Sequence, residues 1–190
     1  DLLEKFFNSL NQNDLCFYPN TESLKNKICK YYKIEKENLL ITPGSTFGIK
    51  TIFEAFDVKG KNVITSDYFF PMYQVFSDLY QVELRKAKYK NMRLDMADIR
   101  SLIKWDTKFI ILANPNSPLG DLYSEEQIID LLETDIPVII DEAYIEFTGQ
   151  GSCVHLLKKY PNLIVVKTFS KAYGAAGCRV GFVISSKENM

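Results

Sequence analysis

Short apolar runs alternate with amphipathic stretches over most of this chain, and the alternation limits the folds that the sequence can adopt. Apolar runs typical of buried strands occupy residues 39–41, 63–64, 109–112, 138–140, 163–166 and 180–184. Helical patterns lie between them at about residues 46–56, 72–81, 95–103, 124–134 and 152–160. Strands separated by helices need right-handed crossovers, which place helices on both faces of a mainly parallel sheet. We therefore predict a three-layer α/β fold in which helices sandwich a mainly parallel sheet.

The composition argues against several functional classes. A formal net charge of −1, with no basic run, is unlike a nucleic-acid-binding surface. No apolar stretch reaches the roughly 18 residues of a membrane span, and the first residues lack the build of a signal peptide. We therefore predict a cytoplasmic protein without a nucleic-acid or membrane partner. The four cysteines form no CxxC pair and the chain has one histidine, so we predict reduced thiols and no metal site.

Polar segments follow four of the predicted strands at their carboxyl ends. These segments are Gly44-Ser45-Thr46, Asn116-Ser117, Asp141 and Ser170-Lys171. In an open parallel sheet, ligands bind in the crevice beyond the carboxyl ends of the strands. The four segments are therefore predicted to share one site.

Three charged residues in the second half of the chain form a distinctive chemical set. Lys171 can form an imine, Arg179 can hold a phosphate, and Asp141 can pair with a protonated pyridine nitrogen. Gly44 stands between a strand and a helix, where free N–H groups favour an anion. These are the groups that pyridoxal phosphate (PLP) requires, so we predict a PLP enzyme.

The same residues allow other interpretations. The turn at Gly44 could be an ordinary helix cap, Tyr144 could be a packing residue, and Lys171 alone could be a surface lysine. The segment from Gly44 to Thr51 has the length of a P-loop, which would indicate an ATP site. Ile49, however, stands where a P-loop has glycine directly before its lysine. The combination of residues favours PLP over a nucleotide.

Six motifs along the chain carry a resemblance to a known family. They are Tyr18-Pro19, PGSTFGI (43–49), FPMY (70–73), NPNSPLG (114–120), DEAYIEF (141–147) and SKAYGAAGCRVGF (170–182). Together they resemble fold-type I PLP-dependent aminotransferases, in the branch of histidinol-phosphate aminotransferase and threonine-phosphate decarboxylase. The resemblance implies the aspartate aminotransferase-like fold, with an N-terminal helical segment (1–35) that leads into a PLP-binding large domain (36–190). It also implies a small C-terminal domain, which we expect to be absent from this chain.

The resemblance assigns roles to individual residues. Lys171 matches the Schiff-base lysine, Asp141 the partner of the pyridinium nitrogen, and Tyr144 the tyrosine that bonds the cofactor's phenolic oxygen, so these three are the expected catalytic residues. Phe70 matches the aromatic residue that stacks on the cofactor. Tyr18 matches a tyrosine that reaches the neighbour's cofactor phosphate, which implies a homodimer. The expected phosphate-binding residues are Ser45, Thr46, Ser170 and Arg179, with Thr168 as a weaker match and Gly44 as the turn beside them.

The sequence departs from the family pattern at several positions. Thr46-Phe47 replaces a common acidic pair, Cys16-Phe17 precedes Tyr18 where Asn-Arg is frequent, and two further departures concern cofactor contacts. Ser117 stands where an asparagine usually contacts the phenolic oxygen, so either Ser117 or Asn116 is expected to make that contact. Phe70 keeps the stacking ring but lacks the hydroxyl of the more usual tyrosine. These departures weaken the case for histidinol phosphate as the substrate.

The resemblance implies an aminotransferase that works through a lysine Schiff base. It would pass an amino group from a small, phosphorylated amino compound to a keto acid. Two alternatives stay open at this point. One is a PLP-dependent decarboxylase of a phosphorylated amino acid, and the other is a PLP-binding core without turnover.

Overall fold

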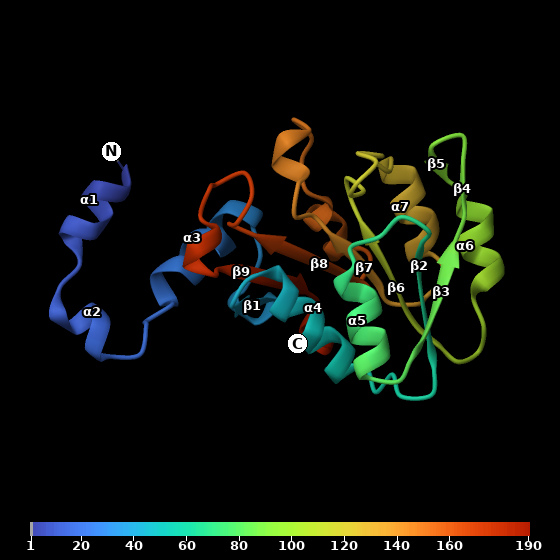
Figure 1. Cartoon of the computed structure of the whole chain (residues 1–190), viewed down its shortest axis with the longest axis horizontal. Coiled ribbons are helices and arrows are strands. Elements are labelled where there is room, and N and C mark those ends of the chain that lie inside the picture. Colours follow the sequence, from blue (N-terminus) through green and yellow to red (C-terminus); the bar gives the residue numbers. More distant parts are fainter. Residues whose placement is uncertain (1) are drawn as a thin grey trace.

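The computed structural model describes residues 2–190, and these residues place a seven-stranded sheet at the centre of the molecule (Figure 1). The strands are β1 (Leu39–Thr42), β2 (Asn62–Ser66), β3 (Glu83–Ala87), β6 (Thr107–Ala113), β7 (Val138–Asp141), β8 (Leu163–Thr168) and β9 (Gly181–Ser185). They lie in the order β1-β9-β8-β7-β6-β2-β3. The strands from β8 to β3 are parallel to one another, whereas β9 is antiparallel to both β8 and β1. The predicted mainly parallel sheet is confirmed.

Helices cover both faces of this sheet and complete the three layers. On one face, α4 (Ser45–Ala55) and α5 (Met72–Leu79) bury Ile49, Phe53 and Phe76 against the strands. The opposite face is covered by α3 (Glu22–Tyr32), α6 (Met96–Leu102), α7 (Glu125–Leu132) and the 3₁₀ helix η3 (Cys153–Lys158). The other helical elements are α1 (Leu2–Ser9), α2 (Gln12–Cys16), η1 (Lys36–Asn38), η2 (Ile145–Phe147), η4 (Ala176–Cys178) and η5 (Lys187–Asn189). Within residues 2–190, each helix is too short or too polar to traverse a membrane.

The central strands are buried on both faces. Along β6, Phe109 and Ile111 belong to the core beneath α4 and α5, whereas Ile110 and Leu112 belong to the opposite core. Successive side chains of a strand point to opposite faces, so a strand between two cores needs an apolar residue at nearly every position. This requirement explains why β6, β7 and β8 are visible in the sequence as continuous apolar runs.

Strand β3 was not predicted, and neither was the ribbon formed by β4 (Tyr89–Lys90) and β5 (Arg93–Leu94). β3 lies at the edge of the sheet and contains Glu83, Arg85 and Lys86. Charged side chains are common on edge strands, where they discourage pairing with another sheet. Because β3 is polar, it does not form the apolar run by which the other strands are predicted.

The helix predicted at residues 152–160 is instead the shorter 3₁₀ helix η3. Ser152 starts it by accepting the backbone N–H of Val154 at 3.3 Å. The tighter 3₁₀ hydrogen bonds are typical of short helical segments such as this one.

The first two helices extend away from the sheet, at the blue end of the chain in Figure 1. Tyr18 lies just beyond α2 and its side chain is fully exposed to solvent. The helical segment predicted at residues 1–35 corresponds to α1, α2 and α3, with Asp1 outside the described residues. The division between this segment and a domain at 36–190 stays a prediction.

Candidate active site

A cavity of about 180 Å³ opens where β7 and β8 end and α4 begins. Its walls come from five separate segments of the chain. They are Ser45 and Thr46; Phe70; Ala113 and Ser117; Asp141, Ala143 and Tyr144; and Thr168, Ser170, Lys171, Ala176 and Arg179. The shared carboxyl edge of parallel strands brings these distant segments together.

Most of the predicted site residues line this cavity, and three do not. Gly44 lies directly behind the wall, next to Ser45. Asn116 is buried outside the cavity, where its side-chain amide donates to the carbonyl of Tyr68 at 2.7 Å. Tyr18 is fully exposed and contributes nothing to the cavity within this chain.

The start of α4 has backbone and side-chain donors that can hold an anion. Gly44, the residue before the helix, has φ 85° and ψ 164°, a conformation that is unfavourable for residues with a Cβ. Within the described part of the chain, no side chain caps this helix, so the amides of its first turn stay available. Those amides and the hydroxyls of Ser45 and Thr46 can donate to phosphate oxygens, aided by the helix dipole.

Arg179 adds a guanidinium to the same end of α4. Its Nη1 donates to the carbonyl of Ala176 at 3.2 Å, and its Nη2 lies 3.5 Å from the carbonyl of Pro43. A Cβ added to Gly44 would stand 2.6 Å from Nη2, so only glycine at this position lets the guanidinium come so close. The guanidinium of Arg179 and the amides at the start of α4 can therefore bind the same anion.

Two further hydroxyls come from the end of β8. Thr168 Oγ1 accepts the backbone N–H of Ser170 at 3.1 Å and donates to Ser170 Oγ at 3.0 Å. These bonds hold the turn that leads into Lys171. The turn thus gives the cavity both hydroxyl donors and a primary amine.

Asp141 ends β7 as a buried carboxylate. Its Oδ2 accepts the hydroxyl of Tyr73 at 3.0 Å, and its Oδ1 accepts the backbone N–H of Ala143 at 3.1 Å. Burial raises the pKa of Asp141 to about 6, and these two hydrogen bonds oppose that rise. A positive charge placed in the cavity would compensate the buried carboxylate.

Tyr73 was missed by reasoning from the sequence. It lies on α5, is completely buried, and belongs by its position to the apolar face of that helix. A buried tyrosine hydroxyl needs a hydrogen-bond partner, and this requirement could have indicated that Tyr73 makes a polar contact. The sequence alone did not indicate that the partner is Asp141.

The primary amine of Lys171 lies close to an aromatic wall. Its Nζ is 5.2 Å from the ring centroid of Tyr144. Phe70 forms another part of the cavity wall and makes an edge contact with Tyr73, with the ring centroids 5.8 Å apart. The cavity therefore combines an amine with flat aromatic surfaces.

The chemistry of these groups fits a phosphorylated pyridine aldehyde. The phosphate would meet hydroxyls, amides and a guanidinium, a protonated ring nitrogen would meet Asp141, and the aldehyde would meet Lys171. Within residues 2–190, histidine, cysteine and acidic side chains form no group of three or more that could hold a metal ion. The donor set suits an organic phosphate.

Comparison with known proteins agrees with this fit. Residues 3–190 match the family described as aminotransferase class I and II. A histidinol-phosphate aminotransferase from Christiangramia forsetii is 40% identical over 183 residues, which cover 94% of this chain and 52% of that protein. The histidinol-phosphate aminotransferase structure from Clostridium acetobutylicum is 28% identical with a TM-score of 0.83, covering 98% of this chain and 58% of the other. The L-threonine-O-3-phosphate decarboxylase structure from Porphyromonas gingivalis is 28% identical with a TM-score of 0.84, covering 100% and 57%.

The chain belongs to the aminotransferase class I and II family. The predicted family resemblance is confirmed. The chain spans about half the length of the curated relatives that it matches.

The raised pKa of Asp141 predicts a stability cost in the cofactor-free protein. A carboxyl group whose pKa is raised on folding contributes stability below its unfolded pKa, and this contribution is lost as the pH rises through about 6. Replacement Asp141→Asn removes the charge, so it should stabilise the cofactor-free protein at pH 7.5 by roughly 2–3 kcal/mol. The gain should disappear near pH 4. Thermal unfolding at both pH values measures it.

The matched control for this prediction is Asp78→Asn on α5. Asp78 is exposed and accepts a hydrogen bond from Gln74 at 2.8 Å, which the amide oxygen of asparagine can still accept. Its unfolding midpoint should differ little from that of the unmodified protein at either pH. Equal midpoints for the Asp141 variant and the unmodified protein at pH 7.5 would show that the buried carboxylate carries no such cost.

Proposed function

We propose that this member of the class I and II aminotransferase family is a PLP-dependent transferase. It moves an amino group from a small phosphorylated amino compound to a keto acid. The observation that carries the proposal is the convergence of Lys171, Asp141 and a set of phosphate donors in one cavity. When bound, the cofactor supplies a conjugated ring that accepts electrons from a bond at the amine-bearing carbon.

The phosphate donors anchor and orient the cofactor. The amides at the start of α4 and the guanidinium of Arg179 provide the positive potential that a phosphate dianion needs. The remaining phosphate-binding groups are the hydroxyls of Ser45, Thr46, Thr168 and Ser170. With its phosphate held there, the cofactor would have its ring at a fixed position relative to Asp141 and Lys171.

Asp141 keeps the ring nitrogen protonated. Tyr73 and the Ala143 amide hold both carboxylate oxygens in place, so Asp141 meets the nitrogen in a fixed orientation. A positive nitrogen beside the carboxylate favours the ionised form and lowers its pKa from the raised value. Asp141 and the cofactor therefore stabilise each other's charge.

Lys171 has two roles in this proposal. Its Nζ would hold the cofactor's aldehyde carbon as an imine, with loss of water, and as a free amine it could accept a proton and return it. Tyr144 Oη and Ser117 Oγ are assigned to the phenolic oxygen of the cofactor. Ser117 is preferred to Asn116 for this contact because Ser117 lines the cavity and Asn116 is engaged with Tyr68.

A phosphorylated amino compound is the substrate class that the comparisons favour. The matched proteins from C. forsetii and P. gingivalis are named for histidinol phosphate and threonine phosphate, respectively. Decarboxylation is the second candidate function, since the P. gingivalis decarboxylase structure matches the whole of this chain. Transamination is preferred because the 40% identical relative is an aminotransferase.

Assembly and location complete the proposal. We assign Tyr18 to the cofactor phosphate of a second copy in a homodimer, in keeping with its full exposure beyond α2. The predicted cytoplasmic location and the large domain at residues 36–190 are retained as parts of the same proposal.

Lys171 should carry the cofactor covalently. Borohydride reduction of the PLP-loaded protein, followed by peptide mass mapping, should place the pyridoxyl group on Lys171. Replacement Lys171→Ala should lower the rate by about 10² to 10⁴ through loss of the proton carrier. As a control, Lys50→Ala on α4 removes a partly exposed lysine that pairs with Glu54 and should leave labelling unchanged. A pyridoxyl group on another lysine would refute the assignment.

The substrate class is tested with the full-length protein loaded with PLP. Phosphorylated amines and phosphorylated amino acids, with and without 2-oxoglutarate, should yield glutamate only when both amine and keto acid are present. Unphosphorylated counterparts should react more slowly, since they lack a charged group whose binding energy can be used to lower the barrier. Release of carbon dioxide without any need for a keto acid would establish decarboxylation instead. A preference for unphosphorylated amino acids would contradict the proposed substrate class.

A further inference from the structure

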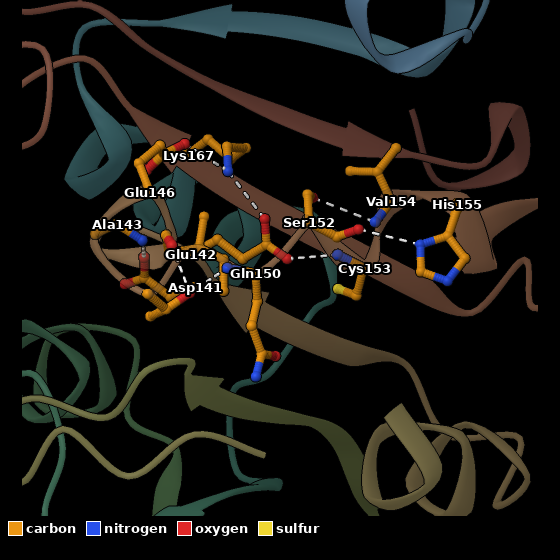
Figure 2. Close-up of polar contacts among 12 residues, drawn as sticks. Asp141, Glu142, Ala143, Glu146, Gln150, Ser152, Cys153, Val154, His155 and Lys167 are labelled. Carbon is orange, nitrogen blue, oxygen red and sulfur yellow. Dashed lines mark hydrogen bonds and ion pairs between the residues drawn. The ribbon is translucent and has the colours of Figure 1, made fainter. Parts of the chain in front are cut away.

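A buried ion triad lies behind the candidate site, on the opposite face of the sheet. Lys167 is 2% exposed, and its Nζ lies 3.0 Å from Glu142 Oε2 and 2.9 Å from Glu146 Oε1 (Figure 2). Glu142 Oε1 also accepts the backbone N–H of Cys153 at 2.8 Å. The ring of Tyr32 lies 5.7 Å from the same Nζ. We call Glu142, Lys167 and Glu146 the buried triad after its two buried members, Glu142 and Lys167; Glu146 is partly exposed.

Strand geometry connects the buried triad to the cavity. Side chains alternate between the faces of a strand, so Asp141 and Thr168 point toward the cavity while the adjacent Glu142 and Lys167 point away from it. The backbone N–H of Glu142 donates to the carbonyl of Val166 at 2.9 Å, near the end of the β7–β8 pairing. The ion pair therefore joins the two strands where they leave the sheet.

The third member of the triad lies in a loop that also lines the cavity. Glu146 belongs to η2 and follows two residues after Tyr144. Its bond to Lys167 links that loop to the end of β8. Thr168, the next residue, begins the turn that leads to Lys171. One ammonium thus connects the segments that carry Asp141, Tyr144 and Lys171.

Stability alone is a weak explanation for such a triad. Buried ions lose their hydration, and well-packed apolar replacements are often as stable or more stable. Burial by itself would lower the pKa of Lys167, but attraction by Glu142, Tyr32 and Glu146 outweighs burial and raises it. The ammonium is therefore charged and contacts both carboxylates. These contacts restrict the relative positions of three chain segments.

We propose that Lys167 is a positioning residue for the candidate active site, which it serves by tying the segments of Asp141, Tyr144 and Lys171 together through Glu142 and Glu146. The proposal rests on the proposed function, because it concerns how well these segments are placed for PLP. Lys167 lies outside the cavity of the candidate site and lines a separate cavity on the opposite face of the sheet, so it acts on the site only through its two partners.

The test replaces Lys167 by methionine and measures PLP binding rather than turnover. PLP should bind the Lys167→Met protein roughly two- to thirtyfold more weakly, the range expected for a substitution that acts on a site without contacting its ligand. The absorption maximum of the bound cofactor should also shift, because Asp141 and Lys171 no longer hold fixed positions. Replacement Lys167→Arg should restore both the affinity and the spectrum, since a guanidinium can bridge two carboxylates.

A second variant keeps the test decisive if methionine alone prevents folding. The double replacement Glu142→Gln with Lys167→Met removes one charge of each sign and leaves Glu146, whose side chain is 22% exposed, in contact with water. This variant should fold and still bind PLP more weakly than the unmodified protein. The matched control is Ile99→Ala on α6, which opens a cavity in the same core away from the buried triad.

The outcomes separate this proposal from the proposed function. If the Ile99 variant loses at least as much thermal stability but keeps its PLP affinity, the effect of Lys167 is positional. Unchanged PLP affinity in the folded Lys167→Met protein or the double variant would overturn the proposal, as would a loss of affinity that simply follows thermal stability in all variants. Failure of the unmodified protein to bind PLP at all would contradict the proposed function instead.

Discussion

The parallel pairing of β6, β7 and β8 is the constraint on which the rest of the structure depends. It brings the carboxyl ends of these strands to one edge, although the segments that follow them are far apart in sequence. Gly181 allows β9 to approach α4, because a Cβ there would stand 2.5 Å from the backbone of Gly44 and Ser45. Arg179 reaches the start of α4 by this route, and the cavity closes around the same edge.

A buried carboxylate at this edge lowers the stability of the cofactor-free protein but provides a partner for a positively charged ligand group. Asp141 is held by Tyr73 and Ala143, yet burial keeps its pKa raised to about 6. A protonated ring nitrogen in the cavity would supply the missing positive charge, so binding of the proposed cofactor should offset the stability cost of burying Asp141. On the opposite face, Lys167 pairs with two carboxylates within the protein.

The sequence predicted the central sheet and much of the cavity because both leave local signals. Buried strands require continuous apolar runs, and residues at strand ends are easily placed at one edge. Strand β3 was missed because an edge strand needs no apolar run. The contact between Tyr73 and Asp141 joins residues 68 positions apart, and pairing at that separation leaves no pattern in a single sequence. The bond from Asn116 to Tyr68 also joins residues that are far apart in the chain. The sequence therefore did not show that Asn116 points to Tyr68 instead of the cavity.

A crystal structure of the protein with PLP bound would locate the cofactor. We expect the phosphate at the first turn of α4, between Ser45 and Arg179, and the ring nitrogen within hydrogen-bonding distance of Asp141. A second cavity, of about 320 Å³ and mostly apolar, lies on the other face beside Tyr31, Tyr32 and Phe169. PLP bound in that cavity, or bound with its ring nitrogen turned away from Asp141, would contradict the account.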